Sequence, residues 1–215
     1  MQKRGYNQNM LKINLVDPLT NAEVLNIKSE YVDPGEIKTA EFQDLVFAMQ
    51  EMVKGNTGGD RRQMVGLAAP QVGVSKQIAL IDETAYSRGK LPQNILVLIN
   101  PEITYMSKDV SDNRENCWSC GNIFGVVSRS ITIKVTALNE NAEEVKYTFN
   151  DFTAVIAQHE IDHLAGIRFP DRIPKTDPWR LRFVDKADIE DYKKKWQKWE
   201  KLCSHEEWLK FKNGV

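Results

Sequence analysis

The residues best suited to chemistry are two histidines and a glutamate in the segment QHEIDH, at residues 158–163. On an α-helix, residues four apart lie on the same face, so His159 and His163 can direct two imidazoles at one point. Glu160 stands beside the first histidine and can reach a water on a metal without binding the metal itself. The pattern H-E-x-x-H therefore predicts a metal-dependent hydrolase with two ligands and a general base. The alternative is a solvated helix that carries two surface histidines.

A metal hydrolase of this kind needs at least one further ligand. One class continues the pattern as H-E-x-x-H-x-x-G-x-x-H. The chain follows that spacing as far as Gly166, but Phe169 occupies the place of the last histidine, which excludes this class. The third histidine, His205, lies in a charged tail and makes an unconvincing ligand. Glu190 is a downstream carboxylate with nothing around it that marks it as a ligand.

The remaining candidates are the thiols of Cys117 and Cys120, which lie between predicted strands. One thiolate joined to the two histidines would give three protein ligands and an open fourth position, which is the arrangement of a catalytic site. A lone C-x-x-C also fits half of a structural zinc site or a redox pair. The residues alone leave these alternatives open.

The elements that must position these residues follow from hydrophobic periodicity. A helix is predicted over residues 39–53, where five apolar side chains share one face, and a second over residues 152–164. Short runs rich in β-branched residues predict strands at 77–81, 95–99, 131–137 and 145–149, the second ended by Asn100-Pro101. Strands gathered before one central helix indicate an α+β fold.

The two ends of the chain are less clear. Residues 1–36 show few patterns, although residues 11–15 fit a strand. Beyond residue 175 a second helical pattern covers residues 188–202, with aromatic side chains on one face and lysines over most of the rest. We expect the aromatic face to dock on the domain and the lysines to be solvated, with partner binding as the alternative.

The segment at residues 65–73 is small, apolar and flanked by glycines, with Gln71 as its one polar side chain. Small residues allow close approach of another chain or a substrate. A glutamine there can donate its amide N–H to a developing oxyanion. The alternative is a turn in which Gln71 only satisfies nearby backbone groups.

Composition limits the classes of partner. The 215 residues fit one domain, and 29 basic against 30 acidic residues give a net charge of -1, so neither nucleic acid nor a membrane is expected as the main partner. No stretch approaches the roughly 18 apolar residues that a membrane helix needs. The polar N-terminus and three cysteines predict a soluble protein of a reducing compartment, without a secretory signal.

Three segments together resemble a known family. GLAAPQ at residues 66–71, ENCWS at 115–119 and QHEIDHL at 158–164 are similar, in order and spacing, to the three motifs of peptide deformylases, usually G-x-G-L-A-A-x-Q, E-G-C-L-S and Q-H-E-x-D-H-L. The likeness covers about residues 38–173. It leaves residues 1–36 and the helical tail at 175–215 without a clear counterpart, although we expect all 215 residues to form a single domain.

The resemblance implies small antiparallel sheets packed around the HExxH helix. It also implies that one divalent cation, iron(II) in the native family and often zinc or nickel in isolated protein, is held by Cys117, His159 and His163. Glu160 would be the general base and acid. Gln71 and the backbone N–H of Trp118 would stabilise the oxyanion.

The resemblance also suggests residues around this centre. Glu115 and Arg129 match a structural ion pair of the family that positions the cysteine segment. Gly66 would help to hold the peptide in an extended conformation, and Asn116 stands where substrate backbone passes. Val155, one turn before His159, would line the methionine pocket or simply pack in the core.

The implied activity is removal of the N-formyl group from the initiator methionine of nascent polypeptides, with release of formate. The partners would be N-formylmethionyl peptides and the ribosome surface, in the cytoplasm or, in a eukaryote, an organelle. The departures from the usual motifs motivate two alternatives: a related hydrolase for another N-formyl or N-acyl substrate, and a non-catalytic binding protein of the same fold. These departures are Met64, Asn116, Trp118, Gly121 and Phe124.

Overall fold

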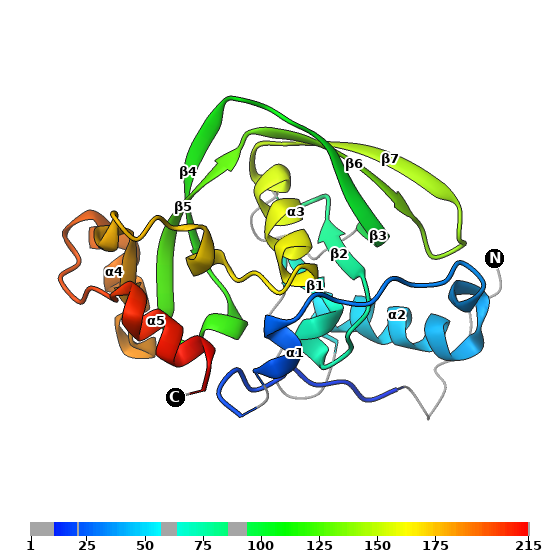
Figure 1. The fold of residues 1–215 in the computed structure, drawn as a ribbon, viewed down its shortest axis with the longest axis horizontal. Coiled ribbons are helices and arrows are strands. Elements are labelled where there is room, and N and C mark those ends of the chain that lie inside the picture. Colours follow the sequence, from blue (N-terminus) through cyan, green and yellow to red (C-terminus); the bar gives the residue numbers. More distant parts are fainter. Residues whose placement is uncertain (1–10, 21, 57–63, 86–93, 215) are drawn as a thin grey trace.

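The structure, a computed structural model, describes residues 11–20, 22–56, 64–85 and 94–214. Its centre is helix α3 (Asp151–Leu164), which contacts strands of two separate antiparallel sheets (Figure 1). The larger sheet has the order β1-β2-β3-β6-β7, and the smaller has the order β4-β5-β8. The predicted α+β arrangement around the HExxH helix is confirmed.

The larger sheet contains the strands predicted from periodicity. Its β3 is longer than expected, because the chain does not leave the sheet at Asn100-Pro101. Asn100 takes a positive φ of 50°, and the pairing of β3 with β6 shifts register between Ile99 and Glu102. A bulge tolerates a proline that a regular ladder would not, so the strand continues. The strands are β1 (Gly66–Ala68), β2 (Ile78–Asp82), β3 (Ile95–Met106), β6 (Thr132–Leu138) and β7 (Glu144–Asn150).

The smaller sheet was not predicted from the sequence. It consists of β4 (Val110–Asn116), β5 (Ile123–Ser130) and β8 (Leu181–Phe183). Strand β4 carries mainly polar and charged residues and lies at a sheet edge, so it lacks the apolar alternation that identifies a half-buried strand. Strand β8 has three residues and follows α3, outside the group of strands that precede the helix.

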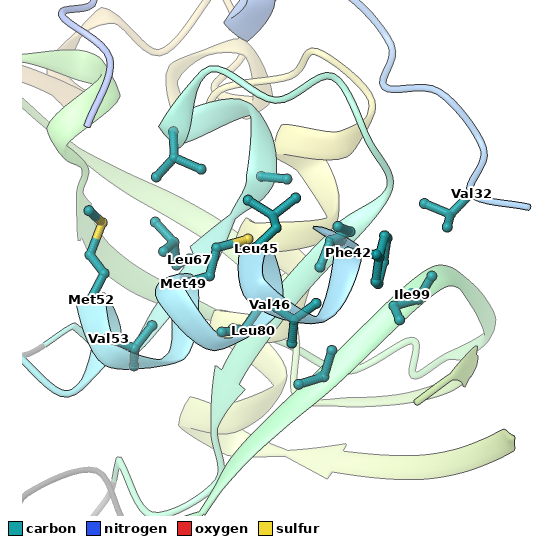
Figure 2. Packing of buried hydrophobic residues seen from close by; sticks show 14 of the residues in the cluster. Val32, Phe42, Leu45, Val46, Met49, Met52, Val53, Leu67, Leu80 and Ile99 are labelled. Atoms are coloured by element: carbon teal, nitrogen blue, oxygen red, sulfur yellow. The ribbon is translucent and has the colours of Figure 1, made fainter. Parts of the chain in front are cut away.

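Helix α2 (Ala40–Val53) covers the larger sheet and confirms the first predicted helix. The Thr39 hydroxyl accepts a hydrogen bond from the Phe42 N–H at 3.3 Å, which caps the N-terminus. The predicted apolar face is buried, and Figure 2 shows it packed with Leu67 of β1 and Leu80 of β2. Its members are Phe42, Leu45, Val46, Met49 and Met52. The glycine-rich sequence at residues 55–62 predicts an exposed loop after this helix, but most of it lies outside the described residues.

Helix α3 is followed by a glycine that suits its C-terminal end. Gly166 has a φ of 70°, and a Cβ there would lie 2.7 Å from the backbone oxygen of Asn26, so this position requires glycine. Within the helix, the Gln158 amide donates to the Ser130 oxygen at 2.9 Å and accepts from the Ser130 N–H at 3.2 Å. These bonds fix the rotation of α3 relative to the end of β5.

The N-terminal part of the described chain contains no strand at residues 11–15, so that prediction is wrong. The segment instead crosses the first motif, where the Val16 N–H donates to the Gln71 oxygen at 2.8 Å. Helix α1 (Glu23–Asn26) and the 3-10 turn η1 (Glu36–Lys38) follow before α2.

The C-terminal residues do not form one helix over 188–202. Helix α4 (Ile189–Lys195) gives way to the 3-10 turn η7 (Trp196–Lys198), and α5 (His205–Lys212) follows separately. After η7 the chain returns to β8, where the Trp199 indole donates to the Phe183 oxygen at 2.9 Å. The docking of the aromatic face is confirmed most clearly for Tyr192, which is buried. None of the helices formed by the described residues is both long and apolar enough to span a membrane.

Candidate metal centre

Three side chains from two elements converge beside α3. Cys117 follows the end of β4, and His159 and His163 come from one face of α3. Their candidate ligand atoms all lie within 4.8 Å of one another, and the Cys117 sulfur lies 3.4 Å from Nε2 of His163. Among the described residues, this group includes Cys117 but neither Cys120 nor His205.

The group has the chemistry and the spacing of a cation site. A zinc ion binds sulfur at about 2.3 Å and imidazole nitrogen at about 2.0 Å, so tetrahedral angles separate two such ligands by about 3.5 Å. The distance of 3.4 Å between the Cys117 sulfur and Nε2 of His163 matches that spacing. Both residues are buried, and His159 is half-buried. The residues present therefore fit a divalent cation.

The orientation of His159 is set by a carboxylate. Nδ1 of His159 lies 2.8 Å from Oε2 of Glu115, so the ring presents Nε2 to the centre. Glu115 itself receives two hydrogen bonds from Arg129, at 2.7 and 2.9 Å. Burial would raise the pKa of Glu115, but these partners outweigh it and lower the pKa. The expected pair of Glu115 and Arg129 is thus present, and it also reaches a histidine.

Asp162 belongs to the same network, a role that sequence reasoning missed. Arg129 donates to Asp162 at 2.6 Å, and Arg172 also pairs with this carboxylate. The network joins β4, β5 and α3 through buried charges whose hydrogen bonds are shared between elements. The signals in the sequence were the position of Asp162 between the two histidines and its match to the aspartate of the third motif.

Glu160 lies in the centre with one oxygen unsatisfied. The residue is 5% exposed, and Oε2 has no hydrogen-bond partner among the described residues. Burial raises the pKa of Glu160 to about 7, although the two histidines act in the opposite direction. Gly66 lies directly against this side chain, since a Cβ there would lie 2.6 Å from Oε1. A carboxyl with such a pKa can both accept and donate a proton near neutral pH.

Gln71 directs its amide group at the same point. Its Oε1 accepts a hydrogen bond from the Ala68 N–H at 2.8 Å, which identifies Nε2 as the end that faces the centre. Nε2 lies 3.4 Å from the Cys117 sulfur and 3.4 Å from the Ser119 hydroxyl. Gln71 lies on the 3-10 turn η2 (Ala69–Val72), directly after β1. This geometry favours a role in the centre over a simple turn.

The thiols of the C-x-x-C segment differ electrostatically. A hydrogen bond with Cys120 and the charge of His163 lower the pKa of Cys117 well below its usual value. Burial and the hydrogen bond with Cys117 raise the pKa of Cys120. Of the pair, Cys117 is therefore the thiol that loses its proton more readily, and the thiolate is the form that binds a cation. Burial opposes protonation of His159, but Cys117 and Glu115 raise its pKa.

The other predicted residues surround this group at different depths. Trp118 begins the 3-10 turn η3 (Trp118–Cys120), and its side chain is 45% exposed. Its indole donates to the Val16 oxygen at 3.1 Å. Asn116 ends β4 and is exposed, whereas Val155 is buried one turn before His159.

Three departures from the usual motifs have structural explanations away from the reacting groups. Met64 packs against the core cluster around α2. Gly121 has a φ of 60°, and a Cβ there would lie 2.9 Å from the Phe211 ring. Phe124 makes an edge contact with Tyr192 at 5.2 Å between ring centroids. The last two positions thus contact the C-terminal helices of this chain.

Comparison with known proteins decides the family. The chain matches the family model described as polypeptide deformylase over residues 17–179. The chain belongs to the polypeptide deformylase family. The resemblance drawn from three short motifs is thereby confirmed, and the match reaches further towards both ends than the motifs did.

The chain is also similar in sequence and structure to proteins named peptide deformylase. The protein from Pseudothermotoga lettingae is 42% identical over 118 residues, which are 55% of this chain and 64% of that protein. The chain thus spans slightly less than two thirds of that relative's length. The protein from Leptospira biflexa is 33% identical over 156 residues, 71% of this chain and 84% of that protein. The actinonin-bound class I type b peptide deformylase from Acinetobacter baumannii has a TM-score of 0.63 and 31% identity, covering 76% of this chain and 99% of that one.

Proposed function

We propose that this deformylase family member hydrolyses the N-formyl group of N-terminal methionine in newly synthesised polypeptides and releases formate. The observation that carries the proposal is the convergence of a cation site, a buried carboxyl and a side-chain amide. The sulfur of Cys117 is within 4.8 Å of the ligand atoms of both histidines and lies 3.4 Å from Nε2 of Gln71. The names of the relatives support the same activity.

Cys117, His159 and His163 would hold the cation through one sulfur and two nitrogens. Three protein ligands leave a coordination position for water or substrate, as in catalytic sites. A cation held there would supply Lewis-acid chemistry, lowering the pKa of the attacking water and polarising the formyl group. We propose iron(II) as the native cation, with zinc or nickel as substitutes in isolated protein.

Glu160 would move the proton. Its unsatisfied Oε2 accepts a proton from the attacking water, whose oxygen forms the new bond to the formyl carbon. As the carbon–nitrogen bond breaks, the carboxyl delivers this proton to the departing amine. Burial raises the pKa of Glu160, which favours transient protonation of the carboxyl between the two steps.

Negative charge on the formyl oxygen would be stabilised by two N–H donors of the chain. One is Nε2 of Gln71, held in place through Oε1 by the Ala68 N–H. The other is the backbone N–H of Trp118. Donors that are fixed before the reaction need no reorganisation when the charge develops, and removing one such donor typically costs about 10²–10³ in rate.

The peptide would lie beside the same residues. Gly66 begins β1 and Asn116 ends β4, and we assign both to the backbone of an extended peptide. Val155 is buried, yet it belongs to none of the three apolar clusters formed by the described residues. That observation favours the methionine pocket over the core for this side chain.

The partners of this reaction are nascent N-formylmethionyl peptides, met at the ribosome surface in the cytoplasm or in an organelle. A second candidate substrate class is another N-formyl or N-acyl compound. The half-exposed Trp118 favours it, because a large indole next to Cys117 in the chain changes the space available to the peptide.

The two substrate classes are separated by a competition experiment with iron(II)-loaded protein kept free of oxygen. Formyl-Met-Ala-Ser is compared with acetyl-Met-Ala-Ser and with formyl-Gly-Ala-Ser, and formate or acetate is measured. The proposal expects a preference for the formyl-methionine peptide by at least about tenfold, since a large side chain fills an apolar pocket that glycine leaves empty. Equal or better use of another acyl or side chain would replace it with the second candidate.

A further inference from the structure

The C-terminal helix α5 lies beyond residues 17–179 that match the family, yet it packs against the cysteine turn. Trp208 of α5 is fully buried. It belongs to the same apolar cluster as Cys117, Cys120 and Phe169. At the outer side of the turn, the Phe211 ring occupies the space where any side chain at Gly121 would stand.

The charged partner beneath this helix is Arg168, whose guanidinium is fully buried. It donates to the backbone oxygen of Ser119 at 2.9 Å and to Oδ1 of Asn26 at 2.9 Å. The indole of Trp208 covers the guanidinium, with 5.6 Å between the guanidinium carbon and the ring centroid. A buried charge is costly without such partners, so these contacts hold Arg168 in one conformation.

Asp171 connects Arg168 to α5. Its Oδ1 accepts from the Trp208 indole at 2.8 Å, and its Oδ2 accepts from Lys212 at 2.6 Å. The same carboxylate accepts from the Arg168 backbone N–H at 2.9 Å. The side-chain amide of Asn26 closes the arrangement by donating to the Lys212 oxygen at 2.9 Å. Residues from both ends of the chain are therefore tied to the turn.

We propose that Arg168 and Trp208 are positioning residues that brace the turn carrying Cys117, and thereby set the affinity of the candidate centre for its cation. Arg168 acts through the Ser119 carbonyl, two residues after the thiolate. Trp208 acts through Arg168 and Asp171. This inference rests on the cation site of the proposed function, but Trp208 lies in a part of the chain that the family match does not include.

Two substitutions remove the brace without touching a ligand. Arg168→Met keeps an unbranched apolar stem and deletes both guanidinium hydrogen bonds. Trp208→Phe keeps an aromatic ring and deletes the bond to Asp171. The matched control is Trp199→Phe, which deletes an indole hydrogen bond to the Phe183 oxygen in the same C-terminal region. The double variant Arg168→Met/Trp208→Phe tests whether the two residues act as one unit.

The readout is the affinity of the full-length protein for Co²⁺, measured by competition with a chelator, together with the thiolate-to-cobalt absorption band. Residues behind metal ligands typically change affinity by roughly 10- to 100-fold when substituted. We expect a loss of Co²⁺ affinity in that range and a weakened absorption band for Arg168→Met and for Trp208→Phe. Trp199→Phe should keep the wild-type affinity and band. The double variant should bind Co²⁺ no more weakly than the single variant with the lower affinity.

A merely structural role would lower the melting temperature of both variants and leave the Co²⁺ affinity of the folded protein unchanged, which would overturn the proposal. If Arg168→Met does not fold, Trp208→Phe alone decides the question. No peptide is present in this experiment. If the variants lose Co²⁺ affinity as expected but the wild type does not hydrolyse formyl peptides, the proposed function is contradicted and this inference is not.

Discussion

His159 and Glu115 are joined by a hydrogen bond of 2.8 Å between Nδ1 and Oε2, which orients the imidazole towards Cys117. Glu115→Gln keeps the size of the side chain but removes the charge that accepts from both His159 and Arg129. We expect cation affinity to fall roughly 10- to 100-fold, because the ring loses its fixed orientation and basicity. Chelator competition measures this loss.

The control for that substitution is Asp112→Asn on the same strand. Asp112 pairs with Arg180 at 2.9 Å and is largely exposed, so its loss removes an ion pair that does not reach a ligand. Unchanged affinity in Glu115→Gln, or an equal loss in Asp112→Asn, would contradict the role assigned to Glu115.

Gly66 leaves the space in which the Glu160 carboxylate lies, and Gly66→Ala should displace that carboxylate. A Cβ would approach Oε1 to 2.6 Å and the carboxyl carbon to 2.9 Å, which are too close for any side chain to remain in place. Since a well-placed general base contributes about 10²–10⁴ in rate, we expect kcat to fall by about 10²-fold or more. Cation content should stay at the wild-type level. A variant with wild-type kcat would show that the position of Glu160 is not critical.

The Trp118 indole connects the cysteine turn to the N-terminal segment through the Val16 oxygen. Trp118→Phe removes this bond and keeps the backbone N–H, the group proposed to face the oxyanion. We expect unfolding free energy to fall by about 1 kcal/mol, the usual net value of one hydrogen bond, with kcat nearly unchanged. Thermal unfolding and steady-state kinetics measure the two quantities. A loss of kcat beyond about 10²-fold, the size of a lost oxyanion donor, would assign catalysis to the side chain.

Burial of Glu160 makes the stability of the cation-free protein depend on pH. The folded pKa of about 7 lies above the ordinary value of 4.5, so the folded protein binds the proton more tightly than the unfolded chain. Stability must then fall as pH rises from about 4.5 to about 7, by about 3 kcal/mol at roughly 1.4 kcal/mol per pKa unit. Glu160→Gln carries no such charge, so its advantage over wild type should grow across this range. The measurement is urea unfolding of the two cation-free proteins at pH 5 and pH 8. An equal difference in unfolding free energy between Glu160→Gln and wild type at both pH values would contradict this.

Much of the centre could be predicted because its residues lie in short continuous motifs. The spacing of His159 and His163 places both rings on one helix face without any knowledge of the fold. The choice between Cys117 and Cys120 could not be derived from spacing, since it depends on how the turn after β4 meets α3. Only the family resemblance indicated Cys117.

The remaining features depend on isolated residues with no periodic signal. An isolated arginine such as Arg168 is usually exposed, yet this one is buried beneath Trp208. The smaller sheet was missed because β4 is a polar edge strand. The predicted end of β3 at Asn100-Pro101 was wrong because a bulge accommodates the proline and the strand continues. Long-range contacts of this kind leave no local pattern to detect.

The most direct test of the account is formate release from formyl-Met-Ala-Ser by wild type and Glu160→Ala at matched iron(II) content. Because Glu160 is the group proposed to accept and deliver the proton, the account predicts formate from the wild type and a loss of about 10²–10⁴-fold in the variant. Undiminished activity in Glu160→Ala would contradict the mechanism, and a cation-loaded wild type that releases no formate would contradict the function.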